Sequence, residues 1–131
     1  MGRLEKVRED FTKALLRLKE AVERAEREKG SPDYPFFRDS AIQRFEFTFE
    51  VMWKFSKALL EREGVICRSP RGCIRELLST GFIDEETARD LLKMVEDRNL
   101  TVHTYKEEVA EEIFSRLPGY LNALEKLTVI E

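Results

Sequence analysis

The stretch from residue 39 to residue 63, DSAIQRFEFTFEVMWKFSKALLERE, predicts a long helix and decides the fold class. At about 100° per residue, its apolar side chains fall on two nearly opposite faces. The first face consists of Ile42, Phe45, Phe49, Met52, Trp53, Leu59 and Leu60, and the second of Phe47, Val51, Phe55 and Ala58. Such a helix is either central in its bundle or packs a second protomer on its far side. In so small a domain we favour the second arrangement and expect a homodimer.

A wedge of polar side chains runs between these two apolar faces. It consists of Gln43, Glu46, Glu50, Lys54 and Lys57. Glu50 and Lys54 stand at the i,i+4 spacing that favours an ion pair on a helix. The wedge could line a cleft between protomers, where Glu46 and Glu50 would orient functional side chains, or it could be an exposed ion-paired surface.

Segments with helical periodicity flank this stretch on both sides. Apolar residues recur at steps of three and four from residue 4 to residue 25, and again in the segments 84–95 and 109–127. Ser69 and Pro70 predict the start of a short helix that ends near residue 78. No strand signal or internal repeat is present. The sequence therefore predicts an all-α, antiparallel up-and-down bundle of four long helices plus one short helix, with residues 1–131 as a single domain.

Composition limits the kinds of partner that the chain can bind. Lys and Arg number 23 against 26 Asp and Glu, so the net charge is −3 and no overall cationic field attracts nucleic acid. Binding of RNA would need a local basic patch. Arg68, Arg71 and Arg75 form the one basic cluster in the sequence, and this cluster is either a solvated face or a patch for phosphate or RNA. No apolar run is long enough for a signal peptide or a membrane span, so we expect a cytoplasmic protein.

The cysteines and the histidine argue against metal chemistry. Cys67 and Cys73 are separated by five residues, which is the spacing of neither a redox pair nor a zinc pair, and we expect two reduced thiols. The chain has a single histidine and no Glu-x-x-His pair. We therefore expect no metal and no cofactor.

The stretch EDRNLTVHTY, from residue 96 to residue 105, contains that histidine, His103. The β-branched pair Thr101 and Val102 and the capping-box spacing of Thr104 and Glu107 predict that the chain turns here and starts a new helix. His103 would then lie just before a helix N-terminus, whose free N–H groups and partial positive charge suit a phosphate and favour neutral imidazole.

Two side chains of this stretch have the chemistry for metal-free cleavage of RNA. His103 would remove the proton from a ribose 2′-OH, and Arg98 would hold the attacked phosphate with its planar fork of donors. The competing interpretation is structural, because a lone histidine near a helix cap more often has no catalytic role. Tyr105 taken by itself is typical of an amphipathic interface.

The string RNLTVHTY, residues 98 to 105, has the form RxxxxHxY and resembles the signature of the HEPN superfamily, in particular its nucleotidyltransferase substrate-binding and HepT-like branch. The run RDSAIQRFEFTFEVMWK, residues 38 to 54, and the pattern RSPRGCIRE, residues 68 to 76, resemble the same branch. The similarity covers residues 38–127. It implies a dimeric helical bundle encoded beside a minimal nucleotidyltransferase (MNT), and several such pairs act as toxin and antitoxin.

The resemblance also implies a role for each motif residue. Arg98 and His103 would be the ribonuclease residues, in a cleft at the dimer interface, and Tyr105 would be adenylylated by the partner enzyme to silence the toxin. Asn99 and the wedge residues Gln43, Glu46, Glu50 and Lys54 would line the cleft. The added AMP would place bulk and negative charge beside His103 and compete with an RNA phosphate.

Two functions without catalysis compete with the ribonuclease. The chain could be a binding subunit that presents a nucleotide or another substrate to a separate nucleotidyltransferase, which agrees with its acidic net charge. It could also be a plain dimeric adaptor that retains the fold.

Overall fold

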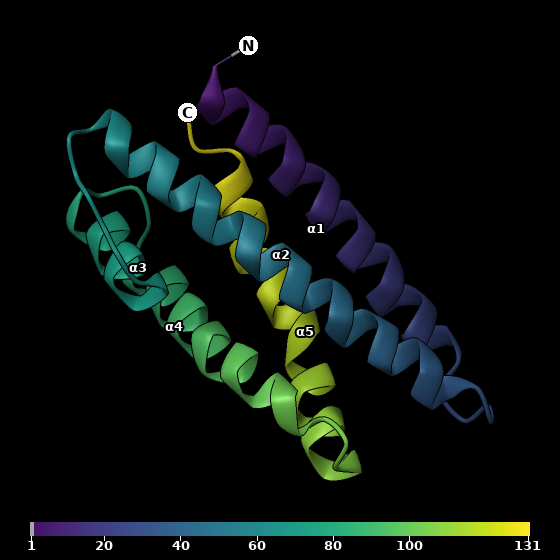
Figure 1. The fold of residues 1–131 in the computed structure, drawn as a ribbon. Helices are drawn as coiled ribbons and strands as arrows, with labels where there is room; N and C mark the ends of the chain where they lie inside the picture. The colour runs from purple at the N-terminus through teal and green to yellow at the C-terminus, as the bar shows by residue number, and fades with distance from the viewer. Residues whose placement is uncertain (1) are drawn as a thin grey trace.

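The computed structural model describes residues 2–131 as a bundle of five α-helices with no strand in that range (Figure 1). The helices are α1 (Arg3–Arg27), α2 (Tyr34–Arg62), α3 (Pro70–Ser79), α4 (Glu85–Leu100) and α5 (Glu107–Thr128), and a 3₁₀ turn, η1 (Thr101–His103), lies between α4 and α5. The predicted all-α bundle of four long helices and one short helix is confirmed.

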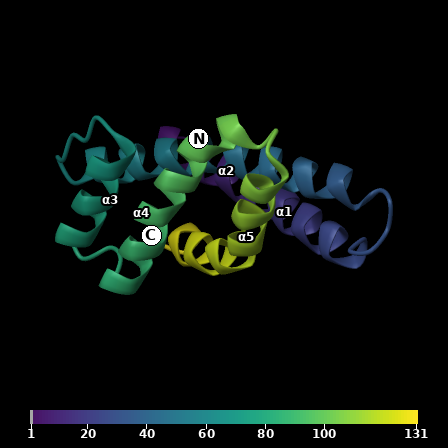
Figure 2. The ribbon, with the colours of Figure 1, turned by 90° about the horizontal axis from the view of Figure 1, so that it is seen from below.

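The long helices pack as two antiparallel pairs around one apolar core. α1 and α2 form a hairpin, and α5 contacts α1, α2 and α4 from behind α2 in the view of Figure 1. Seen from below in Figure 2, α4 lies between α3 and α5. The predicted stripe of α1 does face this core, with Phe11, Leu15, Leu18, Val22 and Ala25 all buried.

α2 begins five residues earlier than predicted, at Tyr34 rather than Asp39. From the sequence, Gly30, Ser31, Pro32 and Pro35 predict a loop that runs to about Phe37, and this prediction is wrong. Pro35 lies in the first turn of the helix, where its missing N–H has no intrahelical partner to lose and its fixed φ suits the helix. Read from sequence alone, the same proline had indicated a break.

The second apolar face predicted for α2 is only partly separate from the core. Phe55 and Ala58 are buried, and the Phe55 ring lies 5.4 Å from the ring of Phe11 on α1. Phe47, by contrast, is 49% exposed. α2 is therefore a central helix of its own bundle, and α1 covers much of the face at which the sequence predicts a second protomer. The homodimer stays a prediction.

Cys67 and Cys73 form a disulfide, so the expectation of two reduced thiols is wrong. The side chain of Ser69 caps α3 by accepting a hydrogen bond from the Gly72 N–H, 3.0 Å long, and the chain turns back on itself. This turn brings the two cysteine Cα atoms to 5.1 Å, within the range that a disulfide spans. Spacing along the sequence does not reveal such a turn.

Hydropathy of the helices gives one further result. Between residues 2 and 131, no helix combines the length and the apolar character needed to cross a membrane.

Candidate functional site

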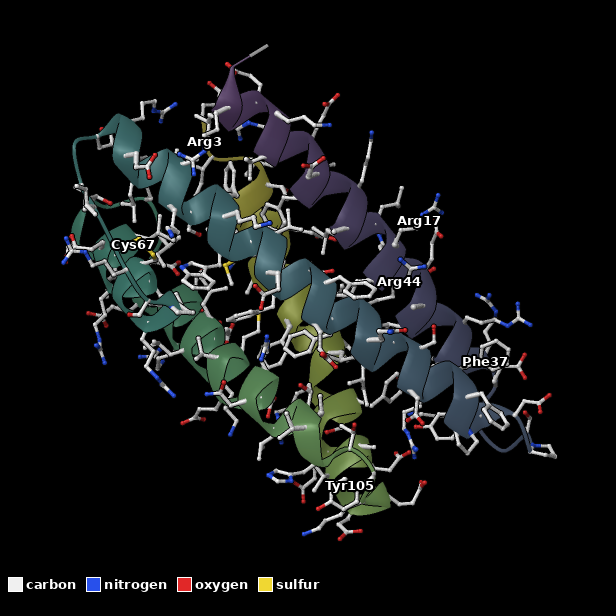
Figure 3. The ribbon with its side chains drawn as sticks, in the orientation of Figure 1. Arg3, Arg17, Phe37, Arg44, Cys67 and Tyr105 are labelled. Carbon is white, nitrogen blue, oxygen red and sulfur yellow. A yellow bond between two sulfur atoms is a disulfide. The ribbon has the colours of Figure 1, made fainter. Side chains whose placement is uncertain are left out.

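The turn between α4 and α5 holds the histidine and the tyrosine of the motif. Figure 3 labels Tyr105 at this end of the bundle. α4 ends at Leu100, and the 3₁₀ turn follows at once. The Thr101 hydroxyl donates a 2.7 Å hydrogen bond to the Arg98 carbonyl, and the Thr104 hydroxyl donates a 2.8 Å bond to the Thr101 carbonyl. These two hydroxyls satisfy carbonyls that the ending helix would leave unpaired. The break predicted for residues 101–104 is thus present.

The predicted capping box at Thr104 and Glu107 is wrong. Thr104 has helical backbone angles and uses its hydroxyl on the preceding turn, whereas an N-cap needs an extended backbone. The N-cap of α5 is Lys106, which is extended and makes no side-chain capping bond. His103 therefore lies three residues before the cap rather than beside it. The influence of the helix N-terminus on its imidazole is correspondingly weaker than predicted.

Arg98 projects from the last turn of α4 toward α2. Its Nη2 donates a 2.8 Å hydrogen bond to Oε1 of Glu50, and its Cζ lies 6.0 Å from the ring centre of Phe49. Its Nε is buried and has no hydrogen-bond partner within residues 2–131. The two charged side chains are 35% and 42% exposed, so water still reaches the pair. Glu50 thus orients Arg98 within one protomer.

His103 and Tyr105 lie side by side on the outer surface of the turn. Their ring centres are 6.1 Å apart and the planes meet edge to face at 68°. Tyr105 is 75% exposed, and the ammonium of Lys106 lies 5.9 Å from its ring. No hydrogen bond joins Arg98 to His103 among the described residues, 2–131. The turn therefore offers an accessible imidazole and phenol, with the guanidinium held separately by α2.

The other predicted site residues divide into two groups. Asn99, Gln43 and Lys54 are exposed, and Glu46 is half-buried, so the polar wedge of α2 is open to solvent. Arg68, Arg71 and Arg75 are also exposed, but they lie in α3 and the loop before it, where Cys67 and Cys73 are joined. Figure 3 shows Cys67 well apart from Tyr105. The structure does not bring this basic cluster to the turn.

A buried ion pair directly before Arg98 was missed by sequence reasoning. Asp97 is fully buried, and Arg116 on α5 donates to both of its carboxylate oxygens, with two bonds of 2.7 Å. The Tyr120 hydroxyl also donates to Asp97. The hydrogen bond to Asp97 raises the pKa of Arg116, and burial, followed by the contact with Asp97, raises the pKa of the Tyr120 phenol. These contacts hold the last turn of α4 against α5.

A second missed anchor, Arg38, joins α2 to the beginning of α5. The Arg38 side chain is 2% exposed and pairs with Asp39, Glu107 and Glu111. The hydrogen bond to Glu107, 2.7 Å long, raises the pKa of Arg38 and holds the pKa of the Glu107 carboxyl below its ordinary value. Because the buried Asp97 pair lies before the turn and the Arg38 pair after it, both ends of the turn are tied to the bundle.

No marker in the sequence distinguished these two anchors from the other charges. In a chain with 37% charged residues, Asp97 and Arg38 look like members of solvated faces. Among residues 2–131, no three His, Cys, Asp or Glu side chains gather in a way that could hold a metal ion. A guanidinium is able to bind phosphate and an imidazole is able to transfer a proton, and Arg98 and His103 supply these two groups.

Comparison with known sequences identifies a matching family and a related protein. The family model described as "Nucleotidyltransferase substrate binding protein like" matches residues 7–129. A probable ribonuclease HepT from Haemophilus influenzae is 30% identical over 89 residues, which cover 62% of this chain and 58% of that protein. The match thus spans less than two thirds of the relative's length.

Comparison with solved structures gives close similarity over most of the fold. A protein from Thermus thermophilus is 46% identical, with a TM-score of 0.78 over 88% of this chain and 93% of the other. The tri-AMPylated HEPN toxin of Shewanella oneidensis, in complex with its MNT antitoxin, is 18% identical, with a TM-score of 0.72 over 99% of this chain and 97% of the toxin. The latter likeness shows the shared fold.

Proposed function

This chain belongs to the nucleotidyltransferase substrate binding protein-like family, and we propose that it is the toxin-like partner subunit of a two-gene module with a minimal nucleotidyltransferase. The observation that carries the proposal is the turn after α4, where His103 and Tyr105 lie together on the surface, five and seven residues after a guanidinium that α2 holds in place. The similarity to a probable ribonuclease HepT supports the same proposal.

The proposed activity is metal-independent cleavage of RNA. His103 takes the proton of a ribose 2′-OH, the 2′-oxygen attacks the neighbouring phosphorus, and the bond to the 5′-oxygen breaks, leaving a 2′,3′-cyclic phosphate and a 5′-hydroxyl that takes its proton from water. Arg98 stabilises the charge on the non-bridging oxygens. Because the Arg98–Glu50 pair is partly exposed, a phosphate can displace Glu50 from Arg98 at little cost.

The proposed site is completed by a second copy of the chain. Phe47 is 49% exposed on α2, and a partner protomer could cover its ring. A homodimer through this part of α2 would also place the polar wedge of one chain beside Arg98 of the other.

The proposed control is adenylylation of Tyr105 by the nucleotidyltransferase. The exposed Tyr105 side chain is open to a modifying enzyme, and its ring lies 6.1 Å from that of His103. An attached AMP would bring a negative charge and steric bulk to the place where an RNA phosphate must lie. Modification would therefore inhibit cleavage without unfolding the bundle.

The experiment compares wild type with His103→Ala for cleavage of RNA in the presence of EDTA and for growth arrest in cells. We expect the variant to lose both activities. Lys93→Ala, a change of an exposed charge on α4, is the matched control and should behave like wild type. If His103→Ala cleaves RNA and arrests growth as wild type does, His103 is not the base and the ribonuclease proposal fails.

A second candidate function is a non-catalytic subunit that presents a nucleotide or another substrate to the nucleotidyltransferase. The family description and the pairing of Arg98 with Glu50 favour it. Co-purification after co-expression, followed by intact-mass spectrometry, separates the two. A stable complex without RNA cleavage and without AMP on Tyr105 would support the binding subunit, whereas AMP mapped to Tyr105 of an active nuclease would support the toxin.

A further inference from the structure

A basic groove lies between α1 and α2, away from the α4–α5 turn. Arg17 and Arg24 of α1 and Arg44 of α2 line it, together with Phe37 and Ser40, and its volume is about 520 Å³. Figure 3 shows Arg17, Arg44 and Phe37 along the seam of these two helices, well separated from Tyr105. The cluster could not be predicted from the sequence, because its arginines come from two helices and alternate with acidic residues along the chain.

The guanidinium groups of the groove are held only by weak contacts. Arg17 pairs with Glu20 at 3.0 Å and Arg24 with Glu28 at 3.2 Å, and all four side chains are partly exposed. Arg44 makes no ion pair within residues 2–131; its Cζ lies 6.0 Å from the ring centre of Phe47. Exposed ion pairs of this kind add little stability, so an incoming anion can replace Glu20 and Glu28 at low cost.

The net charge of the groove is positive, although the chain as a whole is acidic. Its three arginines are accompanied by the carboxylates of Glu20, which lines the groove, and of Glu28, which pairs with Arg24, so one positive charge remains in excess. Each guanidinium can hold a phosphate through two parallel hydrogen bonds. This excess favours an anion locally, although the chain as a whole carries a net charge of −3.

The length and the aromatic content of the groove narrow the choice of anion. Arg17 and Arg24 are seven residues apart, which is about 10 Å along a helix, so two successive phosphate groups match their spacing better than one. The Arg24 guanidinium lies 4.7 Å from the ring centre of Phe37 and offers a flat surface on which a base can stack. In a nucleic-acid strand every residue carries a flat ring that can use this surface, whereas in an acidic peptide only its aromatic residues do.

We propose that the groove between α1 and α2 binds single-stranded RNA, with phosphates at Arg17 and Arg44 and a base against Arg24 and Phe37. It is a second binding site, separate from the turn at which cleavage is proposed. The choice of RNA as the natural ligand rests on the proposed ribonuclease function, whereas the ability of the groove to bind a single strand does not. A strand held there would be retained after the turn has released its product.

The experiment measures fluorescence anisotropy of a labelled 2′-O-methyl oligonucleotide of about 12 nucleotides, within the usual range of single-strand sites. This probe lacks the 2′-hydroxyl and cannot be cleaved. For the double variant Arg17→Ala/Arg44→Ala we expect roughly tenfold weaker binding, because two charge-assisted contacts are lost. The slope of log K against log salt should fall in magnitude by about 1.4, at about 0.7 for each phosphate contact.

The matched control is Lys19→Ala/Arg89→Ala, which removes two exposed positive charges outside the groove. It should bind the probe as wild type does. Equal losses in the two double variants would overturn the proposal, since binding would then follow net charge alone. Unchanged binding in Arg17→Ala/Arg44→Ala, or no binding by wild type, would overturn it as well.

The groove proposal and the ribonuclease proposal can fail independently, and the measurements distinguish the two failures. If wild type cleaves no RNA while Arg17→Ala/Arg44→Ala still loses binding of the probe, the groove proposal holds and the ribonuclease proposal fails. If wild type cleaves RNA through His103 and the groove variant binds normally, the reverse holds.

Discussion

The Arg116 side chain donates two hydrogen bonds of 2.7 Å to the carboxylate of Asp97, the residue directly before Arg98 in the chain. Asp97 is fully buried, whereas the Arg116 side chain is 31% exposed. The pair joins two helices and ends one residue from the guanidinium to which we assign phosphate binding. The geometry of the proposed site therefore depends on an ion pair that has no chemical role in it.

We expect Asp97→Asn to lower the free energy of unfolding by about 2 kcal/mol. Removing one partner of a buried pair is strongly destabilising. The loss is moderated here because the Arg116 side chain is 31% exposed and can form hydrogen bonds to water instead. Urea denaturation measures the change. Glu96→Gln is the matched control, since it makes the same carboxylate-to-amide change at the neighbouring, exposed position and should shift the unfolding free energy by less than about 0.5 kcal/mol. Equal midpoints for the two variants would contradict this role of Asp97.

Stability should fall at high pH because of Tyr120. Burial and the contact with Asp97 raise its pKa from the ordinary value of 10.0. Above that value the phenol ionises in the unfolded chain but stays protonated in the folded one, so its contribution is present below pH 10 and is lost as the pH rises further. One such group gives a slope of about 1.4 kcal/mol per pH unit.

The check is a series of unfolding curves between neutral and alkaline pH. Tyr120→Phe should reduce the alkaline loss, because no phenol remains to ionise at that position, while Tyr34, whose phenol pKa is also raised by burial, keeps its own share. Tyr105→Phe removes a hydroxyl from an exposed side chain and should leave the loss as in wild type. A Tyr120→Phe protein with the wild-type pH dependence would refute the prediction.

Glu50→Gln tests whether the Arg98–Glu50 pair affects the binding of RNA without affecting the stability of the fold. Because the pair is partly exposed, we expect the unfolding free energy to change by less than about 0.5 kcal/mol. If Glu50 competes with phosphate for Arg98, the KM for RNA should fall several-fold, whereas Arg98→Ala should lower kcat about 100-fold or more. A higher KM in Glu50→Gln would mean that Glu50 orients Arg98 for RNA rather than competing with it.

The disulfide between Cys67 and Cys73 should stabilise the fold by about 2 kcal/mol, since it closes a short loop in the unfolded chain. Chemical denaturation with and without a phosphine reductant measures this contribution. The double variant Cys67→Ser/Cys73→Ser should match the reduced protein and show no further response to the reductant. Thiol titration of the unreduced, denatured protein provides a direct check, because two reactive thiols would contradict the bond.

The helix boundaries show which features of the fold can be predicted from residues close together in the sequence. The stripe of α1 and the start of α3 at Ser69 and Pro70 were predictable, because helical periodicity and capping chemistry involve only residues a few positions apart. The start of α2 was not, because Pro35 suits both a break and a first turn. Thr104 failed as a cap for a similar reason: its hydroxyl had a nearer acceptor in the preceding turn.

By itself, the sequence determined the helical class, the break after Leu100 and the motif of Arg98, His103 and Tyr105, all of which depend on neighbours within a turn or two. Only the tertiary structure decided which distant charges meet: Asp97 with Arg116, Arg38 with Glu107, and the arginines of the groove between α1 and α2. Periodicity states which side of a helix is apolar, but the partner of each charged residue depends on how two helices are rotated and offset when their cores pack. That arrangement is a property of the whole bundle, and no segment of the chain specifies it alone.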